Sequence, residues 1–141
     1  MAVFAASFAA DANVGSWKLN ESKSKIPAGA AKNTMVVYTA AGDSYKCVVD
    51  GVDGAGKATH NEWTGKFDGK DYAVTGDSAS DMRAVQKVDD HHYKLTSKKG
   101  GKTTVTGTVE LSADGKSRTL TTHSTDASGK KITATAVYDK Q

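Results

Sequence analysis

The chain of 141 residues contains very little cysteine, proline or arginine. A single cysteine, Cys47, excludes an internal disulfide and any zinc site built from several cysteines. The only proline, Pro27, lies outside every expected strand, so it interrupts no sheet. Arginine occurs only at positions 83 and 118, and the net charge of +3 comes from lysines scattered among acidic residues. Because nucleic-acid binding requires a concentrated basic stripe, we expect no nucleic-acid partner.

No apolar run approaches the roughly 20 residues that a membrane-spanning helix needs, so we expect no membrane span. The most apolar segment, residues 1–10 (MAVFAASFAA), is rich in alanine and ends in small residues. This pattern is typical of the second half of a secretory signal, although no Lys or Arg precedes it. We therefore expect residues 1–10 to be the remnant of a signal peptide or a disordered N-terminus. The first alternative predicts a periplasmic or secreted bacterial protein.

Glycine and aspartate, by contrast, recur along the chain at regular intervals. Asp-Gly and Gly-Gly pairs supply the positive φ angles of tight hairpins, so each pair marks a reversal of the chain. The runs between them alternate apolar and polar residues and are rich in Thr, Val and Tyr, which is typical of half-buried strands. Ten strands are expected, at residues 15–21, 33–40, 44–52, 58–67, 71–76, 80–88, 92–99, 102–112, 116–125 and 130–139.

These alternating runs give each expected strand one apolar and one polar face. An all-β chain of about ten antiparallel strands, with little or no helix, buries such faces by closing into a barrel or by stacking two sheets. An even strand number lets the first strand pair with the last, so we expect one up-and-down β-barrel over residues 11–141. Small inner residues such as Gly65, Gly107 and Ala134 predict a cavity; the alternative is that bulky neighbours fill this space.

The two ends of the chain resemble a known superfamily. Residues 14–19 (VGSWKL) are similar to the opening Gly-x-Trp signature of the calycins, the lipocalin and fatty-acid-binding-protein superfamily. Residues 135–140 (TAVYDK) resemble the closing strand of the intracellular fatty-acid-binding proteins, and residues 101–105 and 120–123 are similar to their eighth and ninth strands. The segment 62–72 looks more like exported bacterial proteins of lipocalin-like type. The resemblance implies a calycin-like barrel that binds a small hydrophobic molecule.

The chain departs from the fatty-acid-binding pattern at the ligand anchor and at the lid. In that family two arginines and a tyrosine hold the ligand carboxylate; the matching positions here are Gly107, Ala136 and Tyr138, so only the tyrosine remains. The link over residues 21–33 is too short for the family's helical lid and allows at most one helical turn. The resemblance therefore implies the barrel more strongly than it implies a carrier that clamps a carboxylate.

The expected inner faces nominate the residues that would contact a ligand. Arg118 shares its alternation phase with Leu120, which makes it a candidate replacement for the missing anion anchor. It could instead stack over Trp17, as a late basic residue does in many lipocalins, or lie in solvent. The hydroxyl of Tyr138 requires a partner, which could be a ligand oxygen, a water or a neighbouring threonine. The full candidate set is Trp63, Phe67, Met82, Gln86, Val105, Leu120, Tyr138 and Arg118.

No arrangement of residues indicates catalysis, a cofactor or a metal. His91 and His92 are adjacent, and adjacent strand residues point to opposite faces, so they are poorly placed to share one ion. We therefore expect non-enzymatic binding of a small hydrophobic or amphipathic molecule inside the barrel. One alternative is a ligand-free barrel that acts as a structural or interaction module. Another is an enzyme acting on a lipophilic substrate at a site around Tyr138 and Arg118.

Overall fold

The computed structural model describes residues 11–125 and 128–141, so the expectation for residues 1–10 lies outside the described residues. The described chain is all-β, and its expected strands are confirmed to within a few residues. The only helix in these ranges is η1, a single 3-10 turn at Glu21–Lys23. The strands are β1 (Gly15–Leu19), β2 (Lys32–Ala41), β3 (Ser44–Val52), β4 (Ala58–Gly65), β5 (Tyr72–Thr75), β6 (Met82–Asp89), β7 (His92–Lys99), β8 (Lys102–Leu111), β9 (Ser117–Thr125) and β10 (Lys131–Lys140).

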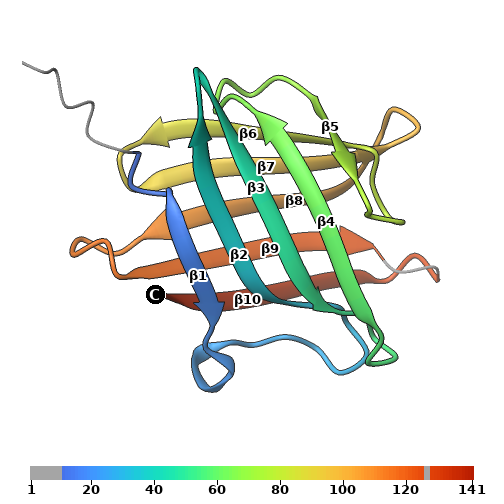
Figure 1. Ribbon diagram of the computed structural model, residues 1–141. Coiled ribbons are helices and arrows are strands. Elements are labelled where there is room, and N and C mark those ends of the chain that lie inside the picture. Colours follow the sequence, from blue (N-terminus) through green and yellow to red (C-terminus); the bar gives the residue numbers. More distant parts are fainter. Residues whose placement is uncertain (1–10, 126–127) are drawn as a thin grey trace, which may run out of the picture.

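The sheet closes on itself, which confirms the expected up-and-down antiparallel barrel. Each strand pairs with its sequence neighbours, and β1 pairs with both β2 and β10. At this closure Trp17 lies between Val36 of β2 and Lys140 of β10. In Figure 1, β1 to β4 cross in front of β6 to β10, and the short β5 joins the two groups. None of the described residues forms a helix long and apolar enough to span a membrane.

Up-and-down connectivity gathers the loops at two ends of the barrel. The open end carries the loops after β3, β5, β7 and β9, together with the link between β1 and β2. This link contains the one helical turn that its length allows, and Lys25 then pairs with Thr135 alongside β10. The capped end carries the loops after β2, β4, β6 and β8. Figure 1 shows these hairpins at opposite sides of the molecule.

Residues 11–14 form a segment, here called the cap, that crosses the capped end. The indole Nε1 of Trp17 donates to the backbone oxygen of Asn13 at 3.0 Å. One carboxylate oxygen of Asp11 accepts a hydrogen bond from the hydroxyl of Tyr93, and the other lies 3.0 Å from Nζ of Lys87. The cap thus ties β1 to the β6–β7 hairpin and covers the core beneath it.

Aromatic side chains fill the barrel below the cap. The ring of Phe67 stacks on Tyr45 with centroids 4.1 Å apart, and Trp63 is 1% exposed. A Cβ at Gly65 would lie 2.6 Å from ring atoms of both Trp63 and Tyr72. The expectation that Gly65 leaves an empty space is therefore wrong, because neighbouring rings occupy it. Here the sequence's alternative, a space filled by bulky neighbours, is the correct one.

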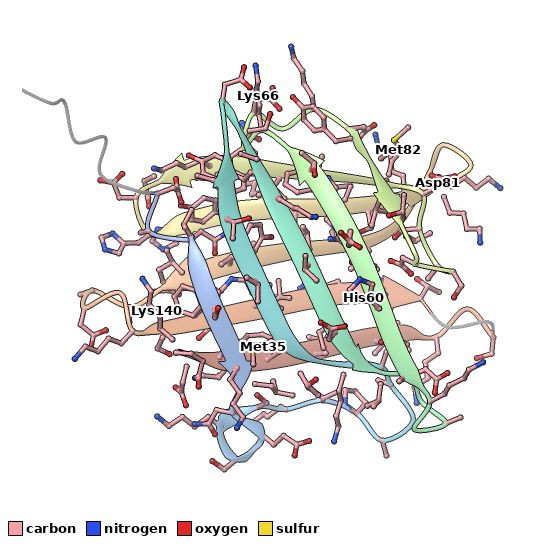
Figure 2. The ribbon with its side chains drawn as sticks, viewed as in Figure 1. Met35, His60, Lys66, Asp81, Met82 and Lys140 are labelled. Carbon is pink, nitrogen blue, oxygen red and sulfur yellow. The ribbon has the colours of Figure 1, made fainter. Side chains whose placement is uncertain are left out.

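The face assignment of β6 is also wrong. Alternation from Met82 placed Met82 and Gln86 inside, whereas Met82 is 40% exposed and Gln86 is exposed as well. Figure 2 shows Met82 at the outer edge of the molecule beside Asp81. Arg83 and Val85 point inward instead, and both are buried. Both phases of this strand contain apolar residues, so the alternation pattern does not distinguish the inner face from the outer one.

Candidate functional site

The guanidinium group of Arg118 lies inside the barrel, carried there by β9. Arg118 is 4% exposed, and its Cζ lies 5.7 Å from the ring centroid of Tyr38 and 5.6 Å from that of Tyr138. Of the three placements weighed from sequence, solvent exposure is therefore wrong. The position over Trp17 belongs to Lys140, whose Nζ lies 5.6 Å from the indole centroid.

Arg118 has unused hydrogen-bonding capacity. Its Nε donates to Oδ1 of Asn13 at 3.1 Å, but its Nη1 is buried and has no hydrogen-bond partner. The side-chain nitrogen of Asn13, which is 1% exposed, also lacks a partner. Among residues 11–125 and 128–141, no acidic side chain forms an ion pair with Arg118. Two buried donors therefore remain unsatisfied in one part of the interior.

The groups around Arg118 do not supply a negative charge. Burial raises the pKa of Tyr38, and burial likewise raises the pKa of Tyr138, so both hydroxyls are neutral at physiological pH. Burial also raises the pKa of the Cys47 thiol. The hydroxyl of Tyr138 donates to the backbone oxygen of Asn33 at 2.9 Å, which answers the question of its partner. The positive charge of Arg118 is thus uncompensated by its described neighbours.

The second buried arginine, Arg83, is satisfied by the protein. Its Nη2 donates to Oδ1 of Asn61 at 3.1 Å and lies 4.0 Å from a carboxylate oxygen of Asp77. Arg83 is 9% exposed, so it is almost as buried as Arg118. The two arginines are therefore similarly buried, but only Arg83 has a carboxylate close to its positive charge.

At the open end, the inner faces of β8, β9 and β10 are less tightly covered. Leu120, Ala134 and Ile132 lie on the inward-facing phase of their strands and are nevertheless partly exposed. Solvent therefore reaches the inner face of this wall. The ends of these strands also carry a pocket of about 340 Å³, whose lining residues are Thr103, Thr104, Val105, Thr106, His123, Ser124, Thr125, Lys131, Ile132 and Thr133.

The structure divides the candidate residues from sequence into four groups. Arg118 and Tyr138 are brought together inside the barrel, where the Cζ of Arg118 lies 5.6 Å from the ring centroid of Tyr138. Val105 and Leu120 lie along the partly exposed wall towards the open end. The remaining candidates are the aromatic pair Trp63 and Phe67, with ring centroids 6.4 Å apart below the cap, and the outward-facing Met82 and Gln86.

Two residues of this site, Asn13 and Tyr38, were not found from sequence. Tyr38 lies on the inner phase of β2, so alternation along that strand could have identified it. Asn13 precedes the first strand and belongs to no periodic pattern. It is separated from Arg118 by 105 positions, so only the folded barrel brings them together.

The outer surface carries a second polar cluster, around His60 on β4, which Figure 2 shows on the outside of the barrel. Its Nδ1 lies 2.6 Å from a carboxylate oxygen of Asp50, and its Nε2 lies 3.1 Å from one of Glu62. The two carboxylates thus bind opposite edges of the imidazole ring and do not converge on one point. Across the described ranges, no three His, Cys, Asp or Glu side chains are grouped to hold a metal ion.

No protein-family model matches the chain, and no curated protein is significantly similar to it. The ten-stranded closed barrel is consistent with the calycin-like fold that the ends of the chain imply.

Proposed function

We propose that the protein binds a small amphipathic molecule inside its calycin-like barrel and catalyses no reaction. The polar group of this molecule contacts Arg118, and its apolar part lies on the inner wall of β8 to β10. The observation that carries the proposal is the buried guanidinium of Arg118, which has an unpartnered Nη1 and no acidic partner among the described residues.

An uncompensated buried charge is costly, since the effective desolvation penalty is several kcal/mol per ion. An oxygen acceptor brought by a ligand would satisfy Nη1 through a charge-assisted hydrogen bond, a contact of about 1.5–3 kcal/mol. The described protein groups around Arg118 do not provide that acceptor. A bound ligand would therefore complete the hydrogen bonding that the fold leaves open.

The wall towards the open end suits the apolar part of the same molecule. Leu120, Ala134 and Ile132 face inward and are partly exposed, so covering them would remove apolar surface from water. Such burial contributes about 25 cal/mol per Å². The pocket of about 340 Å³ at this end is within the range of roughly 300–1,000 Å³ typical of small-molecule sites.

Filling the inner wall with a large side chain tests this proposal. Ala134→Trp places an indole inside the barrel, whereas the control Thr108→Trp places one on the exposed outer face of β8, away from the lining of the pocket. We expect Ala134→Trp to weaken binding of the fluorescent probe dansyl-undecanoic acid at least about tenfold, or about 1.4 kcal/mol. Thr108→Trp should leave the affinity within about twofold.

Two results would overturn the proposal. One is that the unmodified protein does not bind the probe. The other is that both tryptophan variants affect probe affinity equally while remaining folded by circular dichroism. Either result would favour a ligand-free barrel.

A further inference from the structure

We propose that Asn13 sets the charge selectivity of the interior site, so that the barrel prefers a singly charged oxygen group, such as a carboxylate, over the corresponding neutral ester. This inference rests on the proposed function and adds a specificity-determining residue to it. Asn13 lies in the cap, outside the strands, and is 1% exposed.

The side chain of Asn13 has a defined orientation. Its backbone N–H donates to Oδ1 of Asp11 at 2.9 Å, and its backbone oxygen accepts from Nε1 of Trp17 at 3.0 Å. The neighbouring Nε of Arg118 can only donate, so the amide must present its oxygen to it, at 3.1 Å. The amide nitrogen of Asn13 is thereby turned away from Nε and left without a partner.

The two unpartnered groups are both hydrogen-bond donors. Nδ2 of Asn13 and Nη1 of Arg118 belong to side chains that are already hydrogen-bonded to each other, so both lie in the same part of the interior. A group that accepts from both must offer oxygen lone pairs, and one that also carries a negative charge compensates the guanidinium. A carboxylate meets both requirements, because it accepts hydrogen bonds through two oxygens and donates none.

The selectivity depends on Asn13 being an amide. An aspartate has nearly the same size and would still accept from Nε of Arg118, but it would also supply the missing negative charge. A ligand carboxylate would then meet an arginine whose charge is already neutralised by the introduced carboxylate, instead of an uncompensated cation. Asn13→Asp therefore changes the charge of the site with little change in its shape.

The test compares two probes, dansyl-undecanoic acid and its methyl ester, on the unmodified protein and on Asn13→Asp. We expect the unmodified protein to bind the acid at least about tenfold more tightly than the ester. In Asn13→Asp the affinity for the acid should fall to that for the ester or below, while the affinity for the ester changes little. Gln141→Glu makes the same change in net charge at an exposed position that contacts no residue of the site, and should preserve the preference for the acid.

The outcomes separate this inference from the proposed function. Equal affinity of the unmodified protein for acid and ester would overturn the selectivity but leave lumenal binding intact, and would indicate that water satisfies the two donors. Failure to bind either probe would overturn the proposed function itself. An unchanged preference in Asn13→Asp, or an equal loss of both probes, would also contradict the role of Asn13.

A second readout needs no variant. In nuclear magnetic resonance spectra of the unmodified protein, the side-chain amide protons of Asn13 should shift when the acid is added and should shift much less with the ester. Amide protons that do not respond to a bound acid would exclude the contact.

Discussion

The ammonium group of Lys140 lies 5.6 Å from the centre of the indole ring of Trp17, across the strand pair that closes the barrel. The side chain of Lys140 passes over Gly15, where an added Cβ would lie 2.9 Å from its Cε. Gly15 also has a φ of +144°, which side-chain-bearing residues rarely adopt. The Gly-x-Trp sequence therefore makes room for a basic residue over the tryptophan. That residue is Lys140 and not Arg118, which lies in the interior.

Arg118→Met should remove a buried charge at little cost in stability. We expect the free energy of unfolding in urea to stay within about 1 kcal/mol of the unmodified protein or to rise, because the lost hydrogen bond to Asn13 is offset by the removed desolvation penalty. Arg83→Met should lower it by about 1–3 kcal/mol, because Asn61 loses its hydrogen-bond partner. A larger loss for Arg118→Met than for Arg83→Met would show that the fold already compensates Arg118.

Trp63 should contribute strongly to stability. Its ring is 1% exposed, and its Nε1 donates to the backbone oxygen of Arg83 at 2.9 Å. Trp63→Ala should lower the free energy of unfolding by about 3–5 kcal/mol through the cavity that it creates. His60→Ala, on the outer face of the same strand, should change it by no more than about 0.5 kcal/mol. Similar losses in denaturant titrations of the two variants would contradict the face assignment of β4.

Protonation of His60 should be favoured in the folded state. The hydrogen bond to Asp50, and secondly the one to Glu62, raises the pKa of His60 above its ordinary value. Because the unfolded chain titrates at about 6.5, the stabilisation is fully present below about pH 6.5 and is lost as the pH rises through the folded pKa. A titration followed by nuclear magnetic resonance should give a lower pKa for His60 in Asp50→Asn than in the unmodified protein. Identical values would contradict this interaction.

The cap should depend on Asp11. The side chain of this residue is 5% exposed and contacts both Tyr93 and Lys87. Asp11→Ala should lower the free energy of unfolding by about 1–3 kcal/mol and speed hydrogen exchange of the Trp17 indole N–H. Asp90 lies 3.5 Å from the same Lys87 but is highly exposed, so Asp90→Ala should have almost no effect. Equal effects of the two substitutions would mean that the cap does not protect the core.

The architecture was predictable because its signals are local. Asp-Gly and Gly-Gly turns fix the hairpins, and the period of two along each strand fixes most faces, including that of Trp63 on β4. On β6 the pattern failed, since both phases carry apolar residues and the inward position of Arg83 depends on Asn61, which is supplied by another strand. The hydrogen bond between Asn13 and Arg118 could not be predicted from the sequence. It joins two residues 105 positions apart, and no periodic pattern includes both of them.

The most direct test of an interior anion site is the arginine Nε–H region of the ¹H–¹⁵N spectrum. The chain has two arginines, Arg83 and Arg118, so this region contains two signals that one substitution assigns. We predict that adding dansyl-undecanoic acid shifts the Arg118 signal strongly and the Arg83 signal little. If the acid binds and the Arg118 signal does not move, the polar group of the ligand lies elsewhere, and the assignment of Arg118 as its anchor is wrong.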